Sequence, residues 1–132
     1  MTCVASVGIF PLFSNVHSAV QINQTTSEPA TVLSLTGDLD SFSSNYLKEH
    51  ISRLFDEGTY KIIIDLHEVG FVDSAGLGQL VGALKMCFHH GGNLVLVGAN
   101  EAVTDLLHLT KLDTVFKVFD TVEDAVEAVF SQ

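Results

Sequence analysis

The chain has 132 residues, of which 47% are hydrophobic and 17% are charged, a composition that suits one globular domain and excludes a disordered chain. Sixteen acidic residues and six Lys or Arg give a formal charge of −10, which argues against nucleic acid and anionic membranes as partners, since both are bound through clustered basic groups. The chain has two cysteines without a CxxC pair, no basic residue before Lys48 and no apolar stretch long enough for a membrane span. These features indicate a cytoplasmic protein that does not insert into membranes.

The first elements are expected to be a β-hairpin that follows an N-terminal extension. Residues 1–17 are apolar but show no strong period, so we expect an extension that forms an edge strand, an arm packed on a partner, or a mobile terminus. The domain itself is predicted to cover residues 18–132. It begins with a strand at Ala19–Asn23, which a polar loop containing Pro29 joins to a partly alternating strand at Val32–Thr36.

An amphipathic helix and a buried strand are predicted next. Polar side chains between Asp40 and Ser44 offer N-cap oxygens for this helix, and Gly58 offers a stop after it. The run Ile62–Ile64 is continuously β-branched, as expected of a strand that is covered on both faces. The inward stripe of the helix is expected to consist of Leu47, Ile51, Leu54 and Phe55.

The second half of the chain repeats this alternation. A helix closed by Gly91–Gly92 precedes a buried strand at Leu94–Val97, Asn100 caps a short helix, and a strand at Val115–Phe119 leads to a helix that opens at Thr121. Alternation of this kind predicts an α/β domain with a mixed, mostly parallel sheet of about four or five strands, about four helices and right-handed crossovers. The inward side chains are expected to be Leu77, Leu80, Val81, Leu84, Cys87 and Phe88 in the first of these helices, Val103, Leu106 and Leu107 in the next, and Val122, Ala125, Val126 and Val129 in the last.

The segment Val69–Gly78 carries the clearest functional signal, because it places Ser74 near the start of a helix. Free backbone N–H groups and the helix dipole favour an anion there, and a phosphate on Ser74 would add roughly −1.5 to −2 charge units. Asp73 adds a negative charge beside the hydroxyl, and Gly76 and Gly78 leave the nearby surface open to the backbone of another protein. The simpler interpretation is an ordinary helix cap with small residues in a βα turn.

Three motifs follow one another in the chain: LTGDLD at Leu35–Asp40, IIIDL at Ile62–Leu66 and FVDSAGLG at Phe71–Gly78. Their order and spacing resemble the STAS domain, and most closely the stand-alone bacterial anti-sigma-factor antagonists, over nearly everything from about Val20 to Phe130. The resemblance implies a small right-handed β–α superhelix with no catalytic group, metal or cofactor of its own, so the chain is not expected to be an enzyme.

The resemblance also implies a partner-switching function. In that family the serine of the motif, here Ser74, is phosphorylated by an anti-sigma factor that is a serine kinase of the histidine-kinase-like ATPase type. The unphosphorylated form binds this kinase and frees the sigma factor for transcription, and a PP2C-type phosphatase restores it after phosphorylation. Many antagonists carry a second serine after the acceptor, where this chain has Ala75. The rim of the kinase-docking surface carried over to this chain consists of Asp38, Asp73, Ala75, Gly76, Leu77 and Gly78.

The main alternative lies within the same superfamily. Similar domains are adaptor subunits of lipid-transport ABC systems or parts of stress-sensing complexes, and in those roles Ser74 is not phosphorylated. A response-regulator receiver is disfavoured because Phe119-Asp120 stands where a receiver has a Lys, and a dinucleotide site because Gly82 falls one position late for the glycine fingerprint. The histidines show no ligand spacing and are interpreted as solvated or capping residues rather than as metal ligands: His17, His50, His67, His89, His90 and His108.

Overall fold

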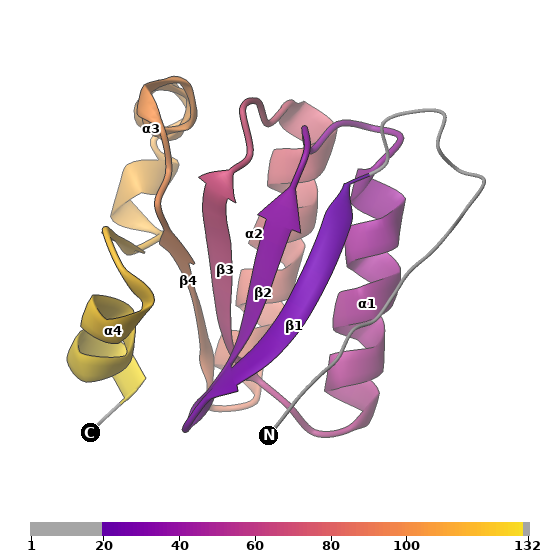
Figure 1. The fold of residues 1–132 in the computed structure, drawn as a ribbon, viewed down its shortest axis with the longest axis vertical. Helices are drawn as coiled ribbons and strands as arrows, with labels where there is room; N and C mark the ends of the chain where they lie inside the picture. The colour runs from indigo at the N-terminus through magenta and orange to yellow at the C-terminus, as the bar shows by residue number, and fades with distance from the viewer. Residues whose placement is uncertain (1–19, 131–132) are drawn as a thin grey trace.

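The hairpin at the start of the domain is the first part of one five-stranded sheet, in the order β1-β2-β3-β4-β5. The structure is a computed structural model that describes residues 20–130. β1 runs antiparallel to β2, and β2, β3, β4 and β5 are parallel to their neighbours, so the predicted α/β fold with a mixed, mostly parallel sheet is confirmed (Figure 1). The strands are β1 (Gln21–Ser27), β2 (Ala30–Thr36), β3 (Lys61–Glu68), β4 (Asn93–Val97) and β5 (Val118–Phe119).

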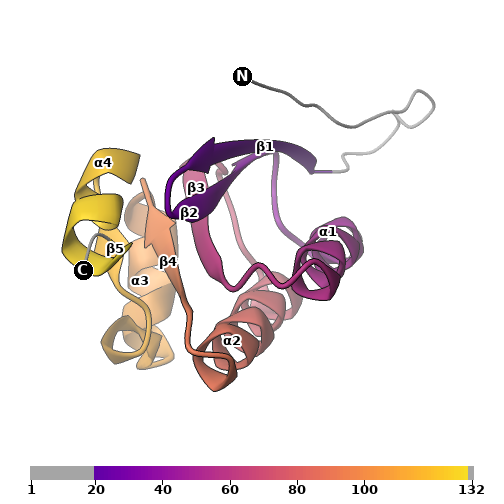
Figure 2. The ribbon, with the colours of Figure 1, turned by 90° about the horizontal axis from the view of Figure 1, so that it is seen from below.

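Helices cover both faces of this sheet, but unequally. Figure 2 shows α1 and α2 on one face, with α4 beside β4 and β5 on the other. α3 packs its buried residues into the same core as α1 and α2. The predicted caps of the last two helices are confirmed, since Asn100 accepts a hydrogen bond from the Val103 amide and Thr121 from the Asp124 amide. The helices are α1 (Ser44–Asp56), α2 (Ser74–His89), α3 (Glu101–Leu109) and α4 (Val122–Ala125), which continues as a π-helical turn, Val126–Phe130.

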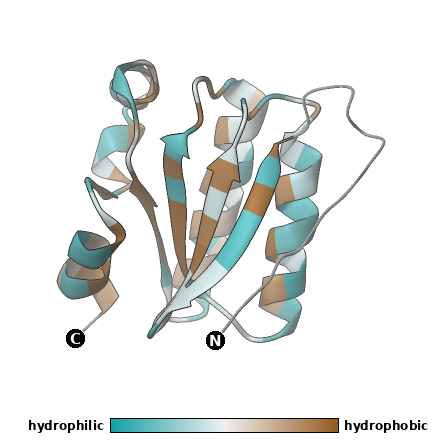
Figure 3. Ribbon diagram, in the orientation of Figure 1, coloured by the Kyte–Doolittle hydropathy of each residue, from teal (hydrophilic) through white to brown (hydrophobic). Residues whose placement is uncertain are grey.

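The β-branched residues of β3 contribute side chains to both hydrophobic cores. Ile62 and Ile64 point into the larger core beneath α1 and α2, whereas Ile63 belongs to the smaller core beneath α4. Successive side chains of a strand point to opposite faces. Because both faces of β3 are covered by an apolar core, all three side chains are fully buried. Figure 3 shows the apolar colouring concentrated in β2, β3 and β4, while most of the edge strand β1 is polar.

Three predicted details differ from the structure at the two edges of the sheet. β1 continues to Ser27, so the loop to β2 is only Glu28-Pro29 instead of a long polar segment. Its polar residues Gln24–Ser27 pair with β2, which hydrophobic periodicity cannot reveal in an edge strand. β5 covers only Val118–Phe119 of the predicted strand Val115–Phe119, because the amides of Val115 and Phe116 donate back to the Leu112 carbonyl oxygen instead of pairing with β4. The predicted extension at residues 1–17 lies outside the described residues.

The inward stripe of α2 also differs at one position. Phe88 was expected inside, but its side chain is 58% exposed. Cys87, which the sequence places in the core, is buried there with Ala83 and Leu84. Because α2 contains several small residues, its apolar periodicity is weak. The sequence alone therefore does not decide whether the residue at the end of the stripe points into the core or toward solvent.

His50 in α1 gives the fold a testable dependence on pH. Its Nε2 lies 2.6 Å from Oε1 of Gln24 in β1, and burial lowers the pKa of His50 below its ordinary value of 6.5, with Arg53 lowering it further against the opposite effect of Glu57. The unfolded chain therefore binds this proton at a higher pH than the folded chain. Stability contributed by neutral His50 is present above pH 6.5 and is lost as the pH falls below that value.

We therefore expect the His50→Gln variant to lose less stability than the unmodified protein when the pH falls from about 7.5 to about 5.5. Urea denaturation of both proteins at the two pH values measures this difference. Gln retains a side chain that can hydrogen-bond to Gln24 but cannot be protonated in this range. An identical pH dependence of the two proteins would contradict the argument.

Candidate functional site

The loops that follow β2 and β3 form a continuation of the sheet. Leu39 and Val72 form a parallel bridge beyond the ends of the two strands. The Leu39 amide donates to the Phe71 carbonyl oxygen at 2.9 Å, and the Asp73 amide donates to the Leu39 carbonyl oxygen at 3.0 Å. The segment that leads to Ser74 is therefore held by the same kind of ladder as the strands themselves.

Asp73, not Ser74, is the cap of α2. One carboxylate oxygen accepts a hydrogen bond from the Gly76 amide at 2.9 Å, as expected of an Asp at the N-cap. The other oxygen accepts from the Ser41 amide at 3.2 Å. Asp73 therefore fixes the start of α2 and also joins it to the loop before α1.

Ser74 is the first residue of α2, and its side chain is exposed. Within residues 20–130, the Ser74 hydroxyl makes no hydrogen bond, and the Ser74 and Ala75 amides meet no acceptor. These two N–H groups stand at the positive end of the helix dipole, because the first amides of a helix have no partner within it. The hydroxyl is thus accessible, and an anion attached to it lies close to two available donors.

The other residues of the predicted rim divide into two groups. Asp38, Ala75 and Gly78 are exposed and Asp73 is half-buried. Gly76 and Leu77 are buried. The two glycines therefore differ in what keeps them small: a Cβ on Gly76 would lie 2.6 Å from the Leu39 carbonyl oxygen, whereas a Cβ on Gly78 would meet nothing within 4 Å.

The turn before α1 is stabilised by Asp40. Its Oδ1 accepts hydrogen bonds from the amides of Ser43 at 2.9 Å and Phe42 at 3.0 Å. These contacts, with the Ser43 amide first, lower the pKa of Asp40 below its ordinary value. The sequence places N-cap oxygens in this region, but Ser43 at the N-cap position makes no capping bond with its side chain.

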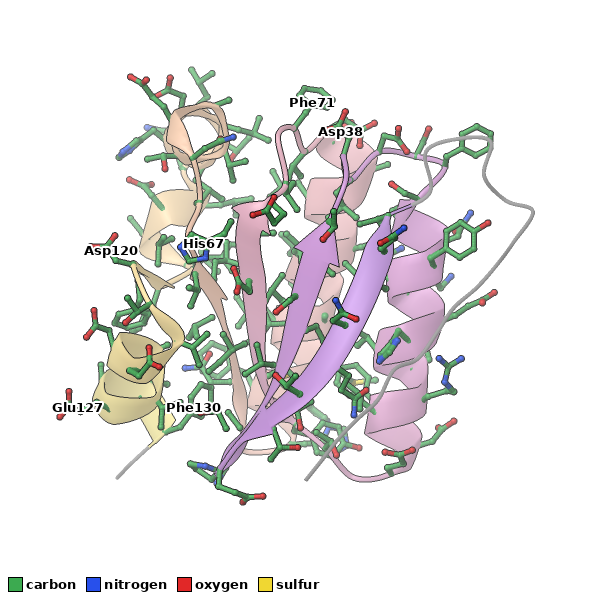
Figure 4. The ribbon with its side chains drawn as sticks, in the orientation of Figure 1. Asp38, His67, Phe71, Asp120, Glu127 and Phe130 are labelled. Atoms are coloured by element: carbon green, nitrogen blue, oxygen red, sulfur yellow. The ribbon has the colours of Figure 1, made fainter. Side chains whose placement is uncertain are left out.

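Sequence reasoning missed two residues at this end of the sheet. Phe71 is 51% exposed in the β3–α2 loop, and Figure 4 shows it beside Asp38. Asn100, predicted only as the cap of α3, also donates from Nδ2 to the carbonyl oxygens of Val69 at 3.3 Å and Gly70 at 3.2 Å. The signal available in the sequence for Phe71 is an aromatic residue two positions before the DSAG motif, beyond the end of the predicted buried strand.

The described part of the chain shows neither a metal centre nor a membrane span. Among residues 20–130, no three His, Cys, Asp or Glu side chains gather in a way that could hold a metal ion. Over the same residues, no helix is both long enough and apolar enough to cross a bilayer.

The chain is similar to known proteins of one family. The family model of the STAS domain matches residues 21–125. The anti-sigma-B factor antagonist of Staphylococcus epidermidis is 32% identical over 87 residues, which are 66% of this chain and 81% of that protein. The crystal structure of an anti-sigma factor antagonist from Mycobacterium paratuberculosis has a TM-score of 0.76 at 26% identity, covering 84% of this chain and 94% of that one.

A more distant structure shows the same fold. It is the Bacillus cell fate determinant SpoIIAA in its phosphorylated form, with a TM-score of 0.66 at 22% identity, covering 83% of this chain and 97% of that one. The likeness in each of these comparisons extends over most of the other protein. These proteins are therefore similar to this chain over most of their own length.

Proposed function

The chain belongs to the STAS domain family, and from that membership we propose that it is an anti-sigma factor antagonist controlled by phosphorylation of Ser74. Relatives with that name match most of the chain. In the proposed cycle, the unphosphorylated chain binds an anti-sigma factor that is a serine kinase of the histidine-kinase-like ATPase type, and the sigma factor is released. The kinase then phosphorylates Ser74, the complex separates, and a PP2C-type phosphatase restores the hydroxyl.

The observation that carries this proposal is the position of the Ser74 hydroxyl. It is exposed at the first residue of α2 and, within the described residues, is not used in any hydrogen bond. A kinase can therefore reach it without unfolding the helix. The phosphate would lie near the unused amides of Ser74 and Ala75, so the modified chain keeps its fold.

The surface that receives the phosphate is already acidic and partly apolar. We use the term docking surface for Asp38, Phe71, Ser74, Ala75 and Gly78, all of which are exposed at this end of the sheet. Gly76 and Leu77 support this surface from below, and Asp73 connects its loops. We propose that the kinase covers this surface when Ser74 is unmodified.

The switch follows from the charge that phosphorylation adds. A phosphate brings roughly −1.5 to −2 charge units to a surface that already carries Asp38 and Asp73. Burying that charge against a partner without a matching cation costs free energy through desolvation. A loss of about 3 kcal/mol weakens binding by more than a hundredfold, which is enough to separate the complex. The domain supplies no catalytic group in this cycle, because the kinase provides the nucleotide and its metal ion.

An affinity pull-down from the source organism's lysate tests the proposal, with Ser74→Ala and Ser74→Asp as the two baits. We expect an ATPase of the kinase type to be retained by the Ala variant and lost by the Asp variant. Ser52→Asp is the matched control, since Ser52 is exposed in α1 and the change adds the same charge away from the start of α2. This control should retain the kinase.

Retention of transporter or scaffold subunits by both baits would contradict the proposal. The chain would then be an adaptor, the alternative that the sequence leaves open. Ser74 would in that case be only the first residue of a helix capped by Asp73.

A further inference from the structure

Asn100 makes more contacts than a helix cap requires. Its Oδ1 accepts from the Val103 amide at 2.9 Å, which caps α3. Its Nδ2 donates to the carbonyl oxygens of Val69 at 3.3 Å and Gly70 at 3.2 Å. One amide side chain therefore joins the first turn of α3 to the loop between β3 and α2, 30 and 31 positions earlier in the chain.

The loop that Asn100 holds is the one that presents Phe71. On the other side of this loop, the Phe71 carbonyl oxygen accepts from the Leu39 amide at 2.9 Å. A Cβ on Gly70 would lie 3.3 Å from Oδ1 of Asp38, so the backbone passes close to that carboxylate. The loop is thus fixed from two directions, although the Phe71 side chain itself is 51% exposed and packs into neither core.

An exposed aromatic side chain on a fixed loop is a suitable anchor for another protein. Interfaces are enriched in aromatic residues that carry much of the binding free energy. The gain is larger when the anchor is already held in its bound position, because binding then orders less of the chain. Phe71 lies three residues before Ser74, so the Cα atoms of the two residues are at most about 11 Å apart, and one partner protein is large enough to cover both.

We propose that Asn100 is a positioning residue of the docking surface: it fixes residues 69–71 so that Phe71 enters an apolar recess of the kinase beside the group that reaches Ser74. The proposal rests on the proposed function and adds a specific anchor and its support to it. Asn100 acts through Phe71 and touches the partner only indirectly. Its removal should therefore loosen the loop and weaken binding while the two cores of the domain remain intact.

The Asn100→Asp variant isolates the two Nδ2 hydrogen bonds. Asp is as good an N-cap as Asn, so the bond from the Val103 amide is retained and α3 stays capped. Both donors to Val69 and Gly70 are lost. Asn100→Ser is the neutral companion variant, which also caps a helix but cannot repel the two carbonyl oxygens by charge. Asn93→Asp is the control for added charge, because Asn93 begins β4 at the opposite end of the sheet, and its Oδ1 accepts from the Leu94 amide.

The first measurement uses the free protein and needs no partner. Nitrogen-15 relaxation should show the order parameters of Gly70 and Phe71 falling from about 0.85 to about 0.6 or below in Asn100→Asp and Asn100→Ser. The Asn93→Asp variant should keep the values of the unmodified protein, and the melting temperatures of all variants should stay close together. Unchanged order parameters at Gly70 and Phe71 would overturn the proposal.

The second measurement is a double-mutant cycle with the ATPase recovered by the Ser74→Ala bait, once it has been purified. We expect Phe71→Ala to weaken binding about thirtyfold or more and Asn100→Asp about tenfold. In the Phe71→Ala background, Asn100→Asp should have little further effect, because the residue it positions is gone. A merely structural role would instead give the full loss in both backgrounds, and that result would overturn the proposal.

The two proposals fail in different ways. If the Ser74 variants behave as expected but Asn100→Asp binds like the unmodified protein, the positioning role is wrong and the phosphorylation switch stands. If Ser74→Ala and Ser74→Asp retain the same partners, the proposed function is wrong. The relaxation data then still decide whether Asn100 fixes the loop.

Discussion

Ser74→Asp is expected to bind the proposed anti-sigma kinase at least tenfold more weakly than the unmodified chain, whereas Ser74→Ala should bind at least as tightly as the unmodified chain. The Ser74 side chain is exposed and, within residues 20–130, makes no hydrogen bond, so neither substitution removes a contact from the fold. A carboxylate at the first residue of a helix interacts favourably with the helix dipole. The free Asp variant should therefore be as stable as the unmodified chain, and its effect should fall on the complex.

Titration calorimetry with the purified kinase measures the three affinities. A phosphoserine carries more charge than Asp, so enzymatic phosphorylation should have a larger effect than the substitution, on the order of a hundredfold or more. Ser52→Asp serves again as the control for net charge. Equal affinities of the Ala and Asp variants would refute an electrostatic switch, and the loss of binding by Ser74→Ala would show that the hydroxyl itself is needed for docking.

Gly76→Ala is expected to destabilise the domain by about 2 kcal/mol, whereas Gly78→Ala on the same helix should leave its stability unchanged or raise it by about 0.5–1 kcal/mol. A Cβ on Gly76 would lie 2.6 Å from the Leu39 carbonyl oxygen and 2.8 Å from Leu39 Cγ. The backbone or the buried side chain of Leu39 therefore has to shift to accommodate the added methyl group. At Gly78 the Cβ meets nothing within 4 Å, so the better helix propensity of Ala is not opposed.

Urea denaturation of the two variants checks this difference. The Leu39 carbonyl oxygen also accepts from the Asp73 amide, so a shift of Leu39 in the Gly76→Ala variant should disturb the loop that leads to Ser74. Gly78→Ala instead tests the docking surface directly, because it adds a methyl group at an exposed position. Equal stabilities of the two variants would contradict this prediction, because they would show that Leu39 shifts to accommodate the added methyl group without a cost in stability.

Much of the fold follows from patterns within single segments. The run Ile62–Ile64 identifies the central strand, because continuous β-branched residues are typical of a strand that is buried on both faces. In the structure these side chains lie in the two cores. Asn100 and Thr121 identify helix starts because capping depends on residues only three positions apart. β1 could not be bounded in the same way, since the polar residues of an edge strand are determined by its pairing with β2 and not by burial.

The candidate site was predictable to a similar extent. Ser74 and Asp73 stand in a local motif, and their place at a helix start follows from its neighbours in the sequence. The bond between Asp73 and the Ser41 amide joins residues 32 positions apart, and the bonds from Asn100 span a similar distance. Such contacts depend on how parallel strands bring their following loops to the same edge, which local patterns do not encode.

The two bonds of the Asp73 carboxylate have a consequence for local unfolding. Because one side chain holds both the Ser41 amide and the Gly76 amide, opening the segment before α1 also removes the cap of α2. The two loops should therefore belong to one cooperative opening unit. Native-state hydrogen exchange should give Ser41 and Gly76 similar opening free energies, both well below that of Ile63 in the centre of the sheet. Asp73→Ala, which removes both acceptor oxygens at once, should lower the two values together.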